Sequence, residues 1–291
     1  MSGSLLLCLA SAATIVSAQG FAGNWEESHT KAQAAVAKLS LSEKIGIVTG
    51  VGWGKGPCSG SASAPKSISY PALCLQDGPL GVRSAASVTA FPAGIHAAST
   101  WDRTLMRLRG RGLGEETKAL GIHVILGPVG GPMGQFANGG RNWEGFGVDP
   151  YLNGVAMEQT IAGIQEGGAQ ACAKHYIGNE QERNRETMNS NIEDRTLHEL
   201  YLWPFAEAVR ANVASVMCSY NKLNGKFACE NKHYMDEILK KELGFRGYIV
   251  TDWNATHSTA DAANAGLDMS MPGEIKISYF PPFSLALWSS T

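Results

Sequence analysis

Three short apolar runs in this sequence end in polar or aromatic side chains that could carry out chemistry. The residues that follow these runs are Lys174, His175, Tyr220, Asp252 and Trp253. A carboxylate at the carboxyl end of a buried strand is the usual way in which an α/β barrel presents a catalytic group. Because the strand ends of a barrel meet at one face, we expect these side chains to share a pocket. Plainer alternatives exist: Asp252 could cap a helix, and His175 could be a core residue.

Two further segments combine charge with glycine. Residues 75–83 place Asp77 and Arg83 on either side of a Gly-Pro turn, although this pattern also suits an ordinary salt-bridged turn. Residues 139–146 hold Arg141 among glycines and aromatic side chains, which is too much charge for a simple connector. The seven histidines are scattered and no His-x-x-x-His or Cys-x-x-Cys pair occurs, so we expect no metal centre.

The elements that must position these residues alternate between strand-like and helical segments from about residue 100. We expect strands at residues 123–126, 169–173, 213–218, 248–251 and 267–271, helices at 104–120, 150–167, 194–211 and 231–244, and a loop at 50–69. Helix caps are expected at Asp149, Asp194 and Asn231, and Pro204 could kink the helix at 194–211 near its middle. Apolar strands separated by helices indicate a parallel sheet that is covered on both faces. Five or more such units favour an α/β fold of the (β/α)8 TIM-like barrel type, which could be incomplete at its C-terminal end; an open sheet is the alternative.

The composition excludes several classes of partner. The chain has 291 residues, of which 44% are hydrophobic and 17% charged, and this suits one large domain. A formal net charge of −2 leaves no basic footprint for nucleic acid, and no basic amphipathic stretch indicates a membrane surface. No Gly-x-Gly-x-x-Gly or Gly-Lys-Ser/Thr loop supports a nucleotide cofactor, and we expect no cofactor. A small or neutral ligand is the expected partner, and the oligomeric state is left open.

The N-terminus has the pattern of a secretory signal. Residues 5–16 are apolar but too few to span a bilayer, and Ala18 ends a small-residue cleavage site. We therefore expect residues 1–18 to be a signal peptide and the protein to be secreted and extracellular. A buried N-terminal helix is the alternative, because residues 1–4 carry no Lys or Arg.

Five cysteines remain after such a cleavage. In an oxidising compartment they would allow two local bridges, Cys58–Cys74 and Cys218–Cys229, each closing a short loop. Cys172 stays single in an apolar context and is expected to be a buried thiol. The alternative is that all five are reduced.

Seven segments together resemble secreted fungal β-glucosidases of glycoside hydrolase family 3. They lie at residues 75–83 (LQDGPLGVR), 91–94 (FPAG), 139–146 (GGRNWEGF), 174–182 (KHYIGNEQE), 216–221 (VMCSYN), 249–253 (IVTDW) and 266–273 (GLDMSMPG). They occur in family order over roughly residues 25–273. The resemblance implies that residues 19–273 are the N-terminal barrel domain of this family and that residues 274–291 are a tail outside its pattern.

The resemblance also implies a reaction and a site. Asp252 would be the nucleophile of a retaining mechanism that removes terminal β-D-glucose from cello-oligosaccharides or aryl glucosides. Asp77 would accept hydrogen bonds from sugar hydroxyls, while Tyr220 and the cationic side chains would keep Asp252 ionised. The pocket for the terminal sugar would be formed by Asp77, Arg83, Arg141, Lys174, His175, Arg185 and Tyr220, with Trp253 beside it.

Departures from the family pattern limit this expectation. The general acid of such enzymes is a glutamate on a second domain far downstream, which this sequence is expected to lack. Retaining hydrolysis needs two carboxyls roughly 5 to 5.5 Å apart, and only Asp252 is assignable. Glu180 and Glu182 are expected to be structural rather than substitutes for the general acid. We therefore expect at most weak activity; a non-catalytic sugar-binding pseudo-enzyme or a truncated gene-model fragment is the alternative. Asn254 begins an Asn-Ala-Thr glycosylation sequon, and a glycan there would obstruct the pocket, so we expect it to be unmodified or the protein inactive.

Overall fold

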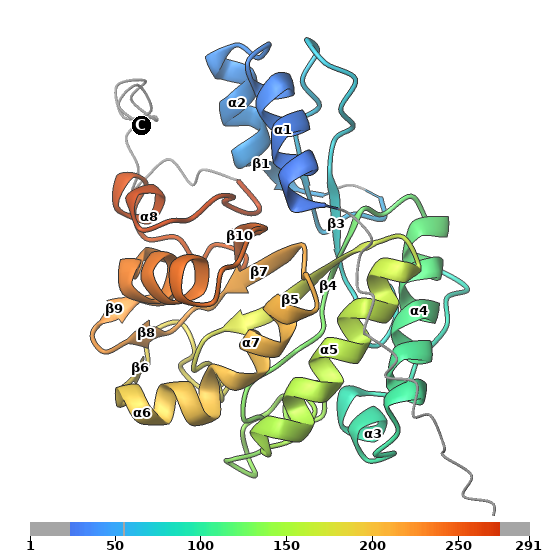
Figure 1. Ribbon diagram of the computed structural model, residues 1–291, viewed down its shortest axis with the longest axis vertical. Helices are drawn as coiled ribbons and strands as arrows, with labels where there is room; N and C mark the ends of the chain where they lie inside the picture. The colour runs from blue at the N-terminus through green and yellow to red at the C-terminus, as the bar shows by residue number, and fades with distance from the viewer. Residues whose placement is uncertain (1–23, 55, 274–291) are drawn as a thin grey trace, which may run out of the picture.

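A curled, seven-stranded sheet lies at the centre of the structure, a computed structural model that describes residues 24–54 and 56–273 (Figure 1). The strands, in their order across the sheet, are β1 (Gly50–Trp53), β2 (Gly60–Ala62), β3 (Cys74–Asp77), β4 (Val124–Leu126), β5 (Gln170–Tyr176), β7 (Ser215–Cys218) and β10 (Tyr248–Thr251). The expected signal peptide (1–18) and tail (274–291) lie outside the described residues.

The five strands from β3 to β10 are parallel. The apolar runs predicted β4, β5, β7 and β10, whereas β3 was not predicted. Parallel neighbours need a crossover, and helices supply it here. The crossover helices are α4 (Arg103–Ala119) before β4, α5 (Pro150–Glu166) before β5, α7 (Trp203–Arg210) before β7 and η3 (His233–Glu242) before β10. Strand residues such as Val124, Ala171 and Ile249 are fully buried. The prediction of an α/β fold with a covered parallel sheet is confirmed.

The N-terminal part of the sheet departs from the βα repeat. β1 pairs with β2, and β2 with β3, in antiparallel fashion and without crossover helices. The prediction of a loop at residues 50–69 was wrong, because these residues contain β1 and β2. Glycine concealed the strand pattern: a Cβ at Gly60 would lie 2.9 Å from the indole of Trp253, so close packing requires a glycine there.

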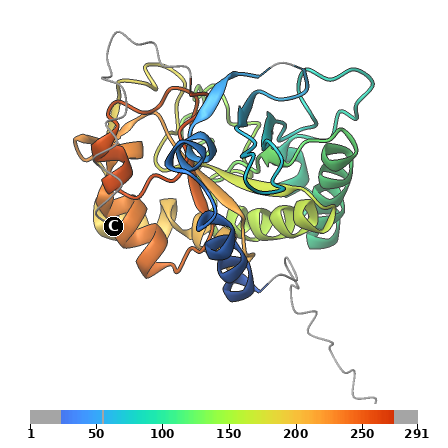
Figure 2. The ribbon, with the colours of Figure 1, turned by 90° about the horizontal axis from the view of Figure 1, so that it is seen from above.

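The two edges of the sheet meet through one extended segment. The NH of Thr251 in β10 donates to the carbonyl of Met269 (3.0 Å), and the NH of Gly50 in β1 donates to the carbonyl of Ser270 (2.9 Å). The strand predicted at residues 267–271 therefore exists only as isolated bridges to its two neighbours. Figure 2 shows this segment passing beside β1. The result is an incomplete α/β barrel.

The long helices begin where their sequences predict. The side chain of Asp149 caps α5, with Pro150 in the first turn, and Asp102 caps α4. Glycines let these two helices approach closely, since a Cβ at Gly110 would lie 2.4 Å from the carbonyl oxygen of Thr160.

The helix predicted at residues 194–211 is broken into separate pieces, a larger interruption than the possible kink at Pro204. The segment is divided into α6 (Asp194–Thr196), the π-helical turn η1 (Leu197–Tyr201) and α7, because Pro204 cannot donate a backbone hydrogen bond. The caps predicted at Asp194 and Asn231 were wrong. Asp194 lies in the first turn after Glu193, and the Asn231 side chain donates to the carbonyl of Leu223 instead of capping η3.

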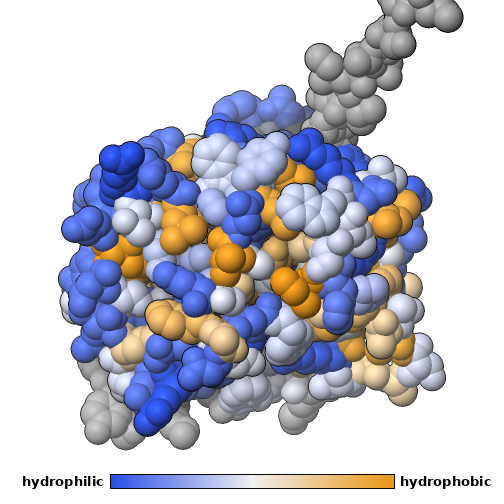
Figure 3. Space-filling model, turned by 90° about the horizontal axis from the view of Figure 1, so that it is seen from below, coloured by the Kyte–Doolittle hydropathy of each residue, from blue (hydrophilic) through white to orange (hydrophobic). Residues whose placement is uncertain are grey.

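Both predicted disulfides are present. Cys58 is bonded to Cys74 and Cys218 to Cys229, whereas Cys172 is a buried free thiol whose pKa burial raises to about 12. None of the described helices is long and apolar enough to cross a bilayer. On the face shown in Figure 3, apolar side chains form small separate spots among polar ones, which is ordinary for a protein surface.

Candidate active site

The polar side chains that follow separate strands meet at the carboxyl ends of those strands. Asp77 ends β3, Lys174 and His175 lie near the end of β5, and Asp252 follows β10. Lys174 contacts Asp77, and His175 lies beside Asp252, so strands far apart in sequence supply neighbouring groups. These side chains therefore lie in one region of the structure.

Asp77 is held in a tight ionic contact. The Lys174 Nζ lies 2.5 Å from Asp77 Oδ1, and Arg83 contacts the other carboxylate oxygen. Burial alone would raise the pKa of Asp77, but Lys174, Arg83 and Arg141 together hold it below the usual value. Asp77 is therefore ionised at neutral pH and can accept hydrogen bonds from hydroxyl groups.

Arg141 connects this contact to the rest of the site. Its Nε donates to Glu144 Oε2 (2.6 Å), its Nη1 lies 3.4 Å from Glu182, and its Nη2 lies 3.3 Å from His175 Nε2. Burial works against the charge of Arg141, yet Glu144 and Glu182 raise its pKa above the usual value. Arg141 therefore remains a cation inside the site.

Glu144 is a carboxylate of this region that the sequence did not single out. Its side chain is fully buried, and Glu144 Oε1 lies 4.0 Å from the Lys174 Nζ while Oε2 accepts from Arg141. One carboxylate thus lies beside both cations and is hydrogen-bonded to Arg141. Its position three residues after Arg141, within the glycine-rich segment 139–146, was the available signal.

Asp252 is buried but has no close cationic partner. Its side chain is 13% exposed, its Oδ1 accepts the NH of Trp253 (2.7 Å), and His175 Nε2 lies 3.7 Å from Oδ2. Burial raises the pKa of Asp252 above the usual value, although Lys174, the Trp253 NH, Tyr220 and Arg141 oppose it. We expected the cations to favour the ionised form; they do, but burial has the larger effect.

His175 contributes a neutral ring rather than a charge. Burial, followed by the charges of Arg141, Lys174 and Arg185, lowers its pKa well below the usual value. His175 is therefore not among the cationic side chains that could keep Asp252 ionised.

Tyr220 and Arg185 form the side of the site next to Asp252. The Tyr220 hydroxyl donates to the carbonyl of Trp253 (3.0 Å) and also reaches the carboxylate of Asp252. The Arg185 guanidinium lies over the Tyr220 ring, 4.6 Å from its centroid, and its Nη1 lies 3.1 Å from Glu182. This arrangement fixes the Tyr220 ring against the strand end.

Trp253 lies mostly within the protein. Its residue exposure is 9%, its Nε1 donates to the carbonyl of Ser59 (3.2 Å), and its ring packs on Gly60 of β2. Only a small part of the indole can face a ligand, so Trp253 forms a wall of the site more than an open stacking surface.

The two glutamates after β5 differ. Glu182 pairs with Arg141 and Arg185, as expected for a structural carboxylate. Glu180 is buried, burial raises its pKa to about 8, and its Oε2 has no hydrogen-bond partner among the described residues. Neither is among the described contacts of Asp252. The described residues also contain no group of three or more His, Cys, Asp or Glu side chains that could hold a metal ion.

This geometry suits the binding of a neutral polyhydroxylated ligand. Asp77 and Arg141 offer charged hydrogen-bonding groups for hydroxyls, while Asp252 presents a carboxylate oxygen without a tight ion pair. Such an oxygen is free to attack an electrophilic carbon.

Comparison with known proteins shows which family the chain resembles. Residues 60–280 match the Glycosyl hydrolase family 3 N terminal domain. The chain is 63% identical over 249 residues to "Probable beta-glucosidase L" of Aspergillus terreus, covering 86% of this chain and 34% of that protein. It is 59% identical over 273 residues to "Beta-glucosidase cel3A" of Pyricularia oryzae, covering 94% and 37%. The chain thus spans about a third of the length of the curated relatives it matches.

Solved structures show the same relationship. The β-D-glucoside glucohydrolase of Trichoderma reesei has a TM-score of 0.84 and 65% identity, over 87% of this chain and 36% of that one. The β-glucosidase 3B of Thermotoga neapolitana, in complex with glucose, has a TM-score of 0.81 and 32% identity, over 86% and 38%. The similarity in fold therefore agrees with the similarity in sequence to proteins of the same family.

Proposed function

Because this chain belongs to glycosyl hydrolase family 3, whose N-terminal domain it matches over residues 60–280, we propose that it forms the nucleophile-bearing part of a retaining β-glucosidase. The substrates would be terminal, non-reducing β-D-glucosyl residues of cello-oligosaccharides, as in cellulose degradation. The observation that carries the proposal is the environment of Asp252, a buried carboxylate that has polar neighbours but no tight ion pair.

Each side chain of the site has a part in the proposed reaction. Asp252 attacks the anomeric carbon of the sugar and forms a covalent glycosyl-enzyme, which water then hydrolyses. Asp77 and Lys174 bind hydroxyls of the same sugar from the opposite side, and Arg141 and His175 complete the pocket. Tyr220 orients the attacking carboxylate. Arg83 and Arg185 lie towards the rim, where 51% and 29% of their side chains are exposed.

The proton donor is not supplied by the described part of the site. A retaining hydrolase uses a second carboxyl roughly 5 to 5.5 Å from the nucleophile to protonate the leaving group. The described contacts of Asp252 are with His175, Tyr220 and backbone groups, and no carboxyl is among them. We therefore propose that the chain acts weakly by itself and depends on a good leaving group.

The test compares the hydrolysis of two substrates by the 291-residue chain. 2,4-Dinitrophenyl β-D-glucoside needs little acid assistance and should be hydrolysed slowly, whereas cellobiose should be cleaved far less. The Asp252→Asn variant is the control and should abolish the slow hydrolysis. Efficient turnover of cellobiose would contradict the missing proton donor, and failure to hydrolyse either substrate would contradict the catalytic proposal.

A sugar-binding protein without activity is the second candidate. It is favoured because no carboxyl is among the described contacts of Asp252. It predicts that glucose binds without turnover and that Asp77→Ala removes the binding, as isothermal titration calorimetry would show. A fragment that does not fold alone would instead fail to melt cooperatively.

We also propose that the protein is secreted after cleavage behind Ala18. The two disulfides support this, since such bridges persist in oxidising compartments. Mass spectrometry of protein from the culture medium of a fungal host should place the new N-terminus at Gln19. Recovery of all the protein inside the cells, with Met1 retained, would contradict the proposal.

Glycosylation at Asn254 is testable in the same material. Asn254 begins the only Asn-x-Ser/Thr triplet of the sequence and is exposed, two residues after the proposed nucleophile. We propose that it is unmodified in active protein. Removal of a glycan by endoglycosidase from fully active enzyme would contradict this proposal.

A further inference from the structure

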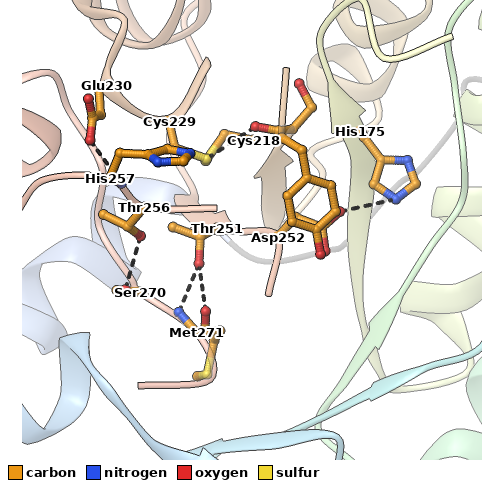
Figure 4. The surroundings of a disulfide bond; sticks show 12 residues. His175, Cys218, Cys229, Glu230, Thr251, Asp252, Thr256, His257, Ser270 and Met271 are labelled. Atoms are coloured by element: carbon orange, nitrogen blue, oxygen red, sulfur yellow. Dashed lines mark hydrogen bonds and ion pairs between the residues drawn. A yellow bond between two sulfur atoms is a disulfide. The ribbon is translucent and has the colours of Figure 1, made fainter. Parts of the chain in front are cut away.

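The Cys218–Cys229 disulfide lies directly beside the proposed nucleophile (Figure 4). Cys218 is the last residue of β7 and the ladder partner of Thr251 in β10. Its carbonyl accepts the NH of Asp252 (3.0 Å), and both cysteines are fully buried. One half of the bridge therefore contacts the backbone of the residue that would attack the sugar.

The segment joined by this bridge contacts residues 252–257 at two more points. The Tyr220 hydroxyl, two residues after Cys218, donates to the carbonyl of Trp253 (3.0 Å). Glu230, next to Cys229, accepts the NH of His257 with its Oε1 (2.9 Å). Asp252, Trp253 and His257 are thus all bonded to residues within two positions of a bridge end.

The opposite side of residues 252–257 is held by the segment that joins the edges of the sheet. Met271 donates its NH to Thr251 Oγ1 (2.8 Å) and accepts the NH of Asn254 (3.0 Å). The residues after β10 therefore lie between two supports. The disulfide provides the covalent link of one support, whereas the contacts of Met271 in the other support are hydrogen bonds.

We infer that the Cys218–Cys229 disulfide positions Asp252 for attack, beyond any contribution that it makes to stability. By tying Glu230 to the end of β7, the bridge keeps the Tyr220 and Glu230 contacts in register with the nucleophile. This inference rests on the proposed function. Loss of a fixed attack geometry slows a reaction steeply, so the bridge should affect the rate more than ligand binding.

The second disulfide offers a matched control. Cys58–Cys74 closes a loop of similar size, with a sequence separation of 16 against 11, so the two bridges should contribute similarly to stability. Its loop reaches Trp253 through the carbonyl of Ser59 but bonds to no atom of Asp252 within the described residues.

The experiment measures covalent labelling of Asp252 by 2,4-dinitrophenyl 2-deoxy-2-fluoro-β-D-glucoside, a reagent that traps the glycosyl-enzyme without an acid catalyst. The wild type, Cys218→Ala/Cys229→Ala and Cys58→Ala/Cys74→Ala are compared well below their melting temperatures. We expect the first double variant to label roughly tenfold or more slowly at saturating reagent, with little change in the half-saturating concentration. The second should label nearly as fast as the wild type.

The pH dependence gives a readout that a purely structural bridge would not change. Tyr220 lowers the pKa of Asp252, so a displaced Tyr220 should move the acid limb of labelling to higher pH in the first double variant. Equal slowing in both double variants, or an unchanged maximal rate in the first, would overturn the inference. No labelling of the wild type would contradict the proposed function instead.

A single substitution keeps the test usable if the double variant does not fold. Glu230→Ala removes the acceptor for His257 and should slow labelling, whereas Glu230→Gln retains an oxygen acceptor and should restore most of the rate. Equal rates in these two variants would count against the positioning role.

Discussion

Asp77 and Asp252 are both buried carboxylates at the carboxyl ends of strands, and the structure treats them in opposite ways. Asp77 touches Lys174 and Arg83, and its pKa lies below the usual value. Asp252 is influenced by Lys174 and Arg141 without touching either, and burial raises its pKa. Their side chains are similarly exposed, at 20% and 13%, so exposure alone does not separate them.

Under the proposed function, this difference would suit the two carboxylates of one site to different tasks. A direct ion pair keeps Asp77 charged, so its remaining lone pairs can accept hydrogen bonds from hydroxyls. The same pairing makes its oxygens less available for attack. More distant cations leave the oxygens of Asp252 available for attack, and the same burial that makes its charge unfavourable makes it more reactive. The two residues therefore differ in how Lys174 acts on them: it is in direct contact with Asp77, whereas it influences Asp252 only through its charge.

The largest expected effect is on catalysis. Asp252→Asn should reduce the labelling and hydrolysis of dinitrophenyl glucosides by roughly 10^4-fold or more, because it removes the attacking group. Asp77→Asn should reduce kcat/KM by about 10^2 to 10^3-fold through weaker binding of the sugar in the transition state. Steady-state kinetics on both variants provide the measurement. Equal losses would remove the functional distinction between the two carboxylates.

The same two variants should change stability in opposite directions. Asp77→Asn leaves Lys174, whose side chain is 3% exposed, without its closest partner and should lower the free energy of unfolding by about 3 kcal/mol. Asp252→Asn removes a charge that burial disfavours and should raise it by on the order of 1 kcal/mol at neutral pH. Urea unfolding at pH 7 tests both, and a destabilised Asp252→Asn protein would contradict the comparison.

The pH dependence should separate the residues next. The pKa of Asp252 is raised in the folded protein, so its charge disfavours folding as pH rises through that value, while activity falls as pH drops through it. The pKa of Asp77 is lowered, so its stabilising contribution is complete above the unfolded value and is lost only as pH falls through the folded value. Labelling rate and melting temperature measured against pH should therefore respond at different pH values.

Tyr220→Phe sharpens this test. The variant loses the hydroxyl that lowers the pKa of Asp252, so the acid limb of labelling should move to higher pH. The contribution of Asp77 to stability at low pH should not change. An acid limb that stays in place would indicate that Tyr220 does not influence the nucleophile.

The smallest expected effect concerns the exposed partner of Asp77. Arg83 is half-exposed, so Arg83→Gln should change the free energy of unfolding by less than about 1 kcal/mol. Thermal melts of this variant beside Asp77→Asn would measure the difference. A loss as large as that of Asp77→Asn would show that Arg83, not Lys174, is the main partner of the carboxylate.

Much of the fold followed from local patterns. The apolar strands β4, β5, β7 and β10 and the capped helix α5 were predicted because burial and capping depend on nearby residues. β1 and β2 were missed because glycine is required there by close contacts with groups distant in the sequence, as Gly60 is by Trp253. The division of the helix around Pro204 was anticipated only as a kink, because propensity does not specify a π-helical turn.

The site showed the same division. The side chains at the strand ends were identifiable because an apolar run followed by a carboxylate or a cation is a local signal. Glu144 was not singled out, because its contacts with Arg141 and Lys174 depend on the folding of a loop onto β5. The neutral state of His175 could not be predicted from the sequence, because only the structure shows its burial beside three cations.

The amino-acid sequence alone predicted the family, the parallel α/β core, a possible pairing of the cysteines and a group of side chains at the strand ends. These depend on residue type and order. The tertiary structure alone decided that Asp77 is tightly paired and Asp252 is not, that His175 is neutral, and that residues 267–271 join the two edges of the sheet. The physical reason is that ionisation and edge pairing depend on burial and on distances between groups far apart in the chain, which no local pattern encodes.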